Sequence, residues 1–235
     1  MLFWSSSKGG SSLGTHRDFL GKNRVFRKIL WVKILLLLYF ICRFMYNICM
    51  SKVLLCSASP RRRELLSKLV RDFDVTKSDV AERSVYRRPH LRVMDLASMK
   101  GRSVSGNGRV VIASDTLVYR NGKYYGKPHG REEARAMLRE LSGVTHTVYT
   151  GVYVAKDGEE VLFYDRATVR FKALSPEEIE RYLDAFAPFD KAGAYGIQDG
   201  VVVKSYRGSF DTIMGLPTEK LGDILQEMGV RDAYE

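Results

Sequence analysis

The stretch Val53-Leu-Leu-Cys-Ser-Ala-Ser-Pro-Arg-Arg-Arg-Glu-Leu-Leu66 joins an apolar run to a helical pattern through a short loop of small residues. The run Val53–Cys56 is apolar throughout and predicts a buried strand. Ser59 followed by Pro60 is typical of a helix start, with serine at the N-cap and proline in the first turn. Leucines at positions 65, 66 and 69 continue one face of that helix. A strand, a loop and a helix in this order are typical of an α/β domain.

The loop after this strand has the features of an anion site. Its small residues let a ligand approach the backbone, and the free amide groups at a helix start favour a negative charge. Ser57 adds a hydroxyl donor, and Arg61 and Arg62 add guanidinium groups suited to phosphate. Three successive arginines oppose the helix dipole, which is unusual unless an anion lies there. These residues favour a polyphosphate ligand, and the alternative is an ordinary capped helix with an exposed basic patch.

Strands and helices alternate along the rest of the chain from Met50. Asn121-Gly122 and Asp157-Gly158 are turn signals that predict two hairpins, and Ser175 with Glu178 forms a capping box. Together these signals predict an α/β domain with a mixed β-sheet flanked by helices. We expect helices at 60–69, 89–104, 130–141, 175–186 and 217–228, and strands at 53–56, 73–76, 109–114, 117–120, 123–125, 147–155, 160–171 and 201–206.

The net charge of +11 over 235 residues is concentrated at the N-terminus. Residues 1–50 contain eight Lys and Arg against one Asp, a net of +7, which leaves +4 for the other 185 residues. These later residues also lack interleaved aromatic and basic side chains, so we expect no nucleic-acid partner. The cysteines Cys42, Cys49 and Cys56 form neither a disulfide framework nor a zinc-binding spacing, which favours a reducing compartment.

Residues 1–49 form an extension with its own composition. Residues 1–28 are Ser/Gly-rich and then basic, which predicts disorder. Residues 29–50 contain the nine-residue apolar run Ile34–Cys42, whereas a membrane span needs about 20 residues. Three interpretations stay open: a membrane anchor with a basic flank, a targeting segment that is later removed, or a stretch upstream of a start at Met50. We therefore predict a cytoplasmic protein, with membrane anchoring through residues 29–50 as the alternative.

Seven further motifs follow the first loop, and they are Leu96-Ala-Ser-Met-Lys100, Ala113-Ser-Asp-Thr116, Gly126-Lys-Pro128, Leu141-Ser-Gly143 with His146, Thr150-Gly-Val152, Asp190-Lys-Ala-Gly-Ala-Tyr-Gly-Ile-Gln198 and Gly215-Leu-Pro217. With Ser57-Ala-Ser-Pro-Arg-Arg62 they span nearly all of residues 52–228 and resemble the Maf family, which is named for septum formation. The resemblance implies a single Maf-like nucleoside triphosphate pyrophosphatase domain over residues 50–235, preceded by the extension, and a homodimer.

The resemblance implies catalytic roles for three charged residues. Asp115 matches the family's proposed general base, although an Asp after the expected strand 109–114 would by itself favour a turn cap. Lys100 and Lys127 match lysines that contact the substrate's phosphates. Lys100 lies on an apolar helix face, where a lysine either extends to solvent or reaches a buried anion.

A divalent metal, Mg²⁺ or Mn²⁺, is the implied cofactor. Asp115 and Glu82 are its predicted ligands, because carboxylate oxygens suit both ions. The family usually has two adjacent acids where this chain has Ala81-Glu82, so one acid is missing. Asp79 is the acid that could contribute in its place.

Residues around the site also indicate which base is bound. Arg61, Thr116 and Gln198 are similar to the branch of the family that accepts dTTP and UTP, and Gln198 can both donate to and accept from a pyrimidine imide edge. With Ser57 and Arg62 these are the predicted substrate-binding residues. The implied reaction is metal-assisted attack of water on the α-phosphorus, which gives a nucleoside monophosphate and pyrophosphate, with modified pyrimidine nucleotides as further substrates. The alternatives are a 7-methyl-GTP pyrophosphatase and a non-catalytic nucleotide-binding regulator of cell division.

Overall fold

The computed structural model describes residues 31–39 and 53–230. The chain divides into two compact units, Met1–Met50 and Ser51–Glu235. In the first unit, residues 31–39 form a helix whose apolar side chains are exposed. The predicted disorder of residues 1–28 and most of the segment 29–50 lie outside the described residues. Within residues 31–39 and 53–230, no helix has the length and hydropathy needed to span a membrane.

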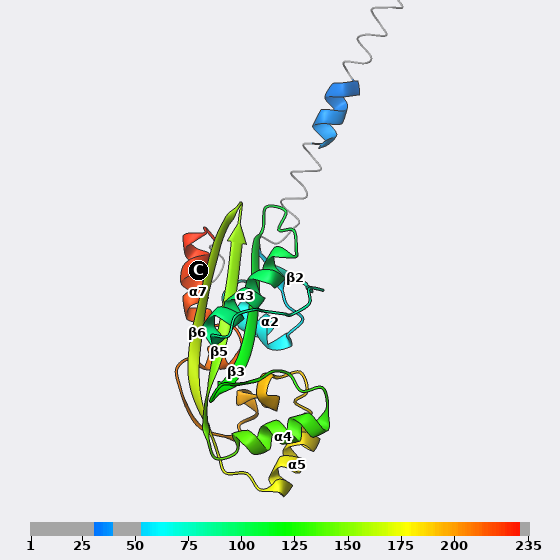
Figure 1. Cartoon of the computed structure of the whole chain (residues 1–235). Helices are drawn as coiled ribbons and strands as arrows, with labels where there is room; N and C mark the ends of the chain where they lie inside the picture. Colours follow the sequence, from blue (N-terminus) through cyan, green and yellow to red (C-terminus); the bar gives the residue numbers. More distant parts are fainter. Residues whose placement is uncertain (1–30, 40–52, 231–235) are drawn as a thin grey trace, which may run out of the picture. The chain divides into compact units, whose positions relative to one another are not determined.

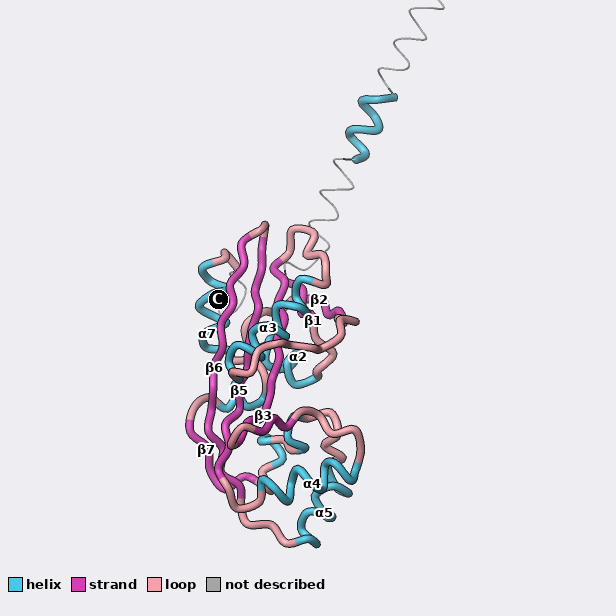
Figure 2. Tube along the Cα trace, in the orientation of Figure 1, coloured by secondary structure: helices cyan, strands magenta, loops and turns pink. Residues whose placement is uncertain are grey.

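The second unit is built on one seven-stranded sheet (Figure 2). Its order is β2-β1-β3-β5-β6-β7, and β4 pairs with β3 off this path. β1 lies parallel to β2 and β3, and all other pairs are antiparallel, which confirms the predicted mixed sheet. The strands are β1 (Val53–Cys56), β2 (Phe73–Thr76), β3 (Val110–Arg120), β4 (Lys123–Tyr125), β5 (Thr145–Lys156), β6 (Glu159–Phe171) and β7 (Val203–Arg207).

Helices cover both faces of this sheet (Figure 1). α3 packs on one face over a small apolar cluster, and the larger core lies on the other face, where α2 and α7 contribute leucines. α4 and α5 lie together at one end of the long strands (Figure 1). The helices are α2 (Pro60–Ser67), α3 (Pro89–Arg102), α4 (Arg131–Leu141), α5 (Pro176–Phe186), α6 (Phe210–Met214) and α7 (Thr218–Glu227), with 3₁₀ turns η1 (Ala192–Ala194) and η2 (Ile197–Asp199).

α3 lies unusually close to the sheet because two glycines face the contact. A Cβ added at Gly151 of β5 would lie 2.4 Å from the carbonyl carbon of Val93 in α3. A Cβ added at Gly101 of α3 would lie 2.1 Å from the ring of Tyr153 in β5. A larger side chain at Gly151 would meet the backbone of α3, and one at Gly101 would displace the Tyr153 ring, so both glycines allow α3 to approach β5 closely.

The turn signals and the α5 cap are confirmed, whereas Ser59 occupies the N-cap position of α2 without a side-chain cap hydrogen bond. β3 and β4 turn at Asn121-Gly122, and β5 and β6 turn at Asp157-Gly158, with positive φ at all four residues. The capping box at the start of α5 is present, with Ser175 Oγ accepting from the Glu178 amide and the Glu178 carboxylate accepting from the Ser175 amide. Each of these signals acts within a few residues, so tertiary contacts do not override it.

The structure corrects several expectations about the elements. β3 is one strand from Val110 to Arg120 rather than two, because β5 continues to pair with it beyond the end of β1. Asp115 therefore lies inside a strand and not after its end. α2 and α3 end two residues earlier than expected, at Ser67 and Arg102. The short helix α6, capped by Ser209, was not expected.

Candidate active site

The site lies where the parallel part of the sheet ends. Cys56, the last residue of β1, pairs with Ala113 of β3. The pairing of β1 with β3 ends here, where the loop 57–59 begins, but β3 continues. Asp115 and Thr116 therefore lie on β3 just beyond the end of β1. A cavity of about 660 Å³ opens here, lined by that loop, the first turn of α2, α3 and the segment after β4. Ligands of open α/β sheets gather at this edge, beyond the carboxyl ends of parallel strands.

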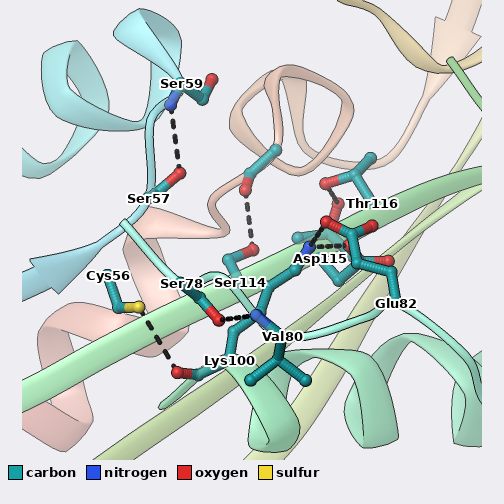
Figure 3. A network of polar contacts seen from close by, with 12 residues as sticks. Cys56, Ser57, Ser59, Ser78, Val80, Glu82, Lys100, Ser114, Asp115 and Thr116 are labelled. Carbon is teal, nitrogen blue, oxygen red and sulfur yellow. Dashed lines mark hydrogen bonds and ion pairs between the residues drawn. The ribbon is translucent and has the colours of Figure 1, made fainter. Parts of the chain in front are cut away.

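Lys100 joins two carboxylates inside this cavity (Figure 3). Its Nζ donates to Asp115 Oδ1 at 2.5 Å and lies 2.9 Å from Glu82 Oε1. The side chains of Lys100 and Asp115 are 12% and 10% exposed, whereas that of Glu82 is 53% exposed. The sequence left open whether Lys100 extends to solvent or reaches a buried anion, and the structure shows that it reaches Asp115.

The neighbours of Glu82 favour its ionised form. Burial raises the pKa of this carboxyl, but the hydrogen bond and charge of Lys100, with the charges of Lys127 and Arg62, outweigh burial and hold the pKa below its ordinary value. Glu82 is therefore a carboxylate at neutral pH, and its exposed position leaves it free to contact a ligand.

Arg62 is fixed by three hydrogen bonds to the protein. Its Nε donates to Gly215 O at 2.9 Å, Nη1 to Ser57 Oγ at 3.2 Å and Nη2 to Thr116 Oγ1 at 3.1 Å. Burial lowers the pKa of this guanidinium, and the nearby charge of Asp115 raises it. A guanidinium carries five N–H groups, so two remain for an anion in the cavity.

Ser57 is arranged as a donor toward the cavity that it lines. Its Oγ accepts the amide N–H of Ser59 at 3.2 Å and Nη1 of Arg62 at 3.2 Å. These two bonds use both acceptor positions of the hydroxyl, so its own hydrogen is left for a ligand oxygen. The loop thus orients the hydroxyl before an anion arrives.

Two further cationic side chains, Arg61 and Lys127, line the cavity and have donor groups that could bind a ligand. Arg61 Nε is buried without a hydrogen-bond partner, and its Nη2 lies 4.0 Å from Asp190 Oδ2. Lys127 makes none of the ion pairs found among residues 53–230. A buried donor without a partner is costly, which favours a ligand oxygen at this position.

The carboxylates fit a magnesium-type metal site. Mg²⁺ is commonly held by one or two carboxylates and completes its shell with water and substrate phosphates. Asp115 and Glu82 supply two such carboxylates, and both contact the single ammonium group of Lys100. No group of three His, Cys, Asp or Glu residues in the described part of the chain could hold a metal by itself. The residues therefore suit an ion that arrives with a phosphate ligand.

The structure brings nearly all the predicted site residues to this one cavity. Gln198 is the exception, since it is exposed in η2 and does not line the cavity. Asp79, the alternative acid, lines it as well. The predicted residues that line the cavity are Ser57, Arg61, Arg62, Glu82, Lys100, Asp115, Thr116 and Lys127.

Sequence reasoning missed several lining residues. Lys77 follows the last residue of β2, which runs parallel to β1 and ends beside it. Parallel pairing of these two strands would have predicted that Lys77 lies at the same edge of the sheet as the loop 57–59. Arg92 lies eight residues before Lys100 on α3, two i, i+4 steps along the same helix face. Tyr124 lies under the Arg92 guanidinium, whose carbon is 5.1 Å from the centre of the tyrosine ring, and no sequence signal indicated its position. Tyr195 lines the cavity from beyond η1; it belongs to the motif Asp190–Gln198, but no role was predicted for it.

Comparisons with known proteins agree with this architecture. A family model described as Maf-like protein matches residues 52–228. A dTTP/UTP pyrophosphatase of Thermosipho africanus is 42% identical over 184 residues, covering 77% of this chain and 96% of that protein. Proteins of the same name from Thermoanaerobacter sp. and Bacillus cereus are 44% and 39% identical, covering 77% of this chain and 98% and 97% of their own lengths. By this match and these identities, the chain belongs to the Maf family.

Proposed function

We propose that this chain hydrolyses nucleoside triphosphates, dTTP and UTP above all, to the monophosphate and pyrophosphate. The observation that carries the proposal is the cavity in which Lys100 holds Asp115 and Glu82. Arg61, Arg62 and Lys127 line the same cavity and supply the positive charge that a triphosphate requires. Carboxylates for a metal and a water, beside cations for phosphates, are the groups that phosphoanhydride hydrolysis needs.

The choice of dTTP and UTP is supported by the relatives, which carry these nucleotides in their names. Arg61 and Thr116, the residues that resemble the dTTP/UTP branch, both line the cavity. Gln198 does not, so its predicted contact with the base requires a movement of η2. Modified pyrimidine nucleotides stay a further predicted substrate class.

In the proposed mechanism, Asp115 accepts the proton of an attacking water. The Asp115 carboxylate is held by Lys100, so one oxygen is fixed and the other can face the water. The water oxygen bonds to the α-phosphorus, and the bond from that phosphorus to the bridging oxygen breaks. Arg61, Arg62 and Lys127 balance the charge that develops on the departing pyrophosphate.

Asp115 and Glu82 would hold the divalent metal of this reaction. Such an ion, Mg²⁺ or Mn²⁺, supplies charge neutralisation of the phosphate oxygens and a lower pKa for the attacking water. Glu82 is the more exposed of the two carboxylates and can shift toward the ion. Asp115 is nearly buried and keeps its position.

Replacement of Asp115 tests the mechanism. We expect Asp115→Asn to lower kcat for pyrophosphate release about 10²- to 10⁴-fold, since the amide cannot accept the water's proton. The assay measures pyrophosphate release from dTTP, UTP, CTP, GTP, ATP and 7-methyl-GTP with Mg²⁺ or Mn²⁺. Asp95→Asn, which changes an acid on α3 that does not line the cavity, is the matched control and should keep wild-type turnover.

Each outcome of this assay has a distinct meaning. Full turnover by the Asp115→Asn variant would remove Asp115 as the base. Activity on 7-methyl-GTP alone would keep the reaction and replace the substrate. A folded wild-type protein that releases pyrophosphate from none of these nucleotides would favour the nucleotide-binding regulator instead.

Two further properties remain predictions. One is a homodimer, which the family resemblance implies and which sedimentation of the purified chain measures. The other is a cytoplasmic location, predicted from the cysteines and the N-terminal extension, with anchoring through residues 29–50 as the alternative.

A further inference from the structure

A line of hydrogen bonds leads from the cavity into the buried part of the sheet. It begins at Arg62 Nη2, which donates to Thr116 Oγ1 at 3.1 Å. Thr116 Oγ1 lies 3.0 Å from Thr150 Oγ1, and Thr150 Oγ1 donates to the carbonyl oxygen of Thr212 at 2.8 Å. The four residues come from α2, β3, β5 and α6, so the line connects elements that are distant in sequence.

The direction of every bond in this line is determined. A hydroxyl has a single hydrogen to donate. Thr150 uses its hydrogen on the Thr212 carbonyl, which cannot donate, so in the bond between the two hydroxyls Thr116 is the donor. Thr116 in turn accepts from Arg62, which has no acceptor of its own. The line therefore runs one way, from the guanidinium to the carbonyl of α6.

We propose that Thr150 is a positioning residue for Arg62 and acts through Thr116. Thr150 and Thr212 are both 0% exposed, and neither lines the cavity, so neither can touch a ligand there. By accepting the hydrogen of Thr116, Thr150 turns a lone pair of that hydroxyl toward Arg62. Hydrogen bonds in such a chain strengthen one another, and a charged donor stands at its start.

This arrangement changes the role of Thr116. Its only hydrogen is used on Thr150, so it cannot donate to a phosphate oxygen. It affects the ligand through Arg62, whose guanidinium it holds together with Ser57 and the Gly215 carbonyl. The residue that resembles a substrate-binding position is thus the link between the cavity and a buried support.

The proposal rests on the proposed function in one respect, namely that a phosphate group is what Arg62 meets. Inorganic pyrophosphate with Mg²⁺ is therefore the probe, and calorimetry on the full chain measures its Kd without turnover. We expect Thr150→Val, which keeps the shape and removes the hydroxyl, to weaken pyrophosphate binding about tenfold. Thr150→Ser keeps the hydroxyl and should stay within about twofold of wild type.

The matched control is Thr147→Val, which removes the hydroxyl of a half-buried threonine on the same strand that does not line the cavity. It should bind pyrophosphate as the wild type does. Equal losses in Thr150→Val and Thr150→Ser would show that any change of packing at this buried position weakens binding, whether or not the hydroxyl is kept, and would overturn the proposal. A wild-type chain that does not bind pyrophosphate would overturn it as well.

A double-mutant cycle separates positioning from a general structural role. Arg62→Lys removes the N–H groups that the line holds, so Thr150→Val should cause no further loss of affinity in that background. The same tenfold loss in both backgrounds would show that Thr150 acts independently of Arg62, contrary to the proposal. Thr116→Val, which breaks the line one step earlier, takes the place of Thr150→Val in the cycle if the latter does not fold.

Nucleotide turnover is measured on the same proteins and is a separate result. A wild-type chain that binds pyrophosphate but hydrolyses no nucleotide would contradict the proposed function. The double-mutant cycle measures binding alone, so it would still test the role of Thr150. With active wild type, kcat/KM for dTTP should follow the pyrophosphate affinities across the set, with Thr150→Val lowered about tenfold and Thr150→Ser close to wild type.

Discussion

At the scale of single residues, the two carboxylates on Lys100 are held differently. The Lys100–Asp115 pair is about nine-tenths buried, and breaking a buried pair leaves an uncompensated charge. Glu82 is more than half exposed, and exposed ion pairs contribute little to stability. Glu82 can therefore leave Lys100 for an arriving cation at small cost, while Asp115 stays in place.

A second buried residue, His146 on β5, is held in its neutral form. It is 2% exposed, its Nε2 lies 2.9 Å from the Tyr195 hydroxyl oxygen, and its Nδ1 has no hydrogen-bond partner. The ring packs edge-on against Phe171 and Tyr195. Burial, together with a smaller contribution from the charge of Arg120, lowers the pKa of His146 to about 4.

This pKa predicts how stability depends on pH. Because the native pKa lies below the unfolded value of about 6.5, the unfolded state binds the proton first as the pH falls. The contribution of His146 to stability is thus fully present above pH 6.5 and is lost as the pH falls toward 4. Between pH 7 and 4.5 we expect the wild type to lose about 2.5 kcal/mol more unfolding free energy than His146→Phe.

Urea unfolding of both proteins at the two pH values measures this difference. His129→Phe, at an exposed position before α4, removes a histidine without touching the buried cluster and should keep the wild-type pH dependence. An equal loss in wild type and His146→Phe would show that other groups cause the acid sensitivity. The comparison uses differences across pH, so a constant packing effect of the new ring cancels.

At the scale of elements, the contact between α3 and β5 sets the geometry of the site. Lys100 is near the end of α3, and its partner Asp115 is on β3, paired with Gly151 of β5. We expect Gly151→Ala to lower the unfolding free energy by about 2–3 kcal/mol, because the new methyl meets the backbone of Val93, which cannot rotate away. We also expect about a tenfold loss of kcat as Lys100 is displaced.

Chemical denaturation and pyrophosphate release from dTTP measure these two effects. Gly222→Ala, inside α7, is the matched control. Its new Cβ would meet only Leu69 Cδ2, at the ordinary contact distance of 3.5 Å. Alanine also has the higher helix propensity there, so this variant should be as stable as the wild type or more stable. Wild-type stability of Gly151→Ala would mean that α3 can move without cost, and that the close approach does not hold the site.

The same elements show what the sequence could predict. The loop from Cys56 to Pro60, the hairpin turns and the α5 cap depend on neighbouring residues, and all were found. α6 has only five residues, and its local cap signals, Ser209 at the start and Gly215 at the end, were overlooked. The continuous β3 was missed for a different reason, since its pairing with β5 is a tertiary contact.

At the scale of the whole molecule, charge and chain organisation separate the two units. The family model begins at residue 52, and Ser51–Glu235 form one compact unit. The described residues that line the cavity all lie between Cys56 and Met214, whereas the excess basic charge belongs to residues 1–50. The catalytic unit should therefore not require the extension.

We expect a chain that starts at Met50 to keep kcat/KM for dTTP within about twofold of the full chain, because every described residue of the site is retained. We also expect it to stay in the supernatant when cell membranes are sedimented. If residues 29–50 anchor the protein, the full chain will sediment with the membranes while the shortened chain does not; if they do not, both will remain in the supernatant. Loss of activity in a shortened chain that still unfolds cooperatively would show that the extension takes part in catalysis and that the boundary at residue 50 is wrong.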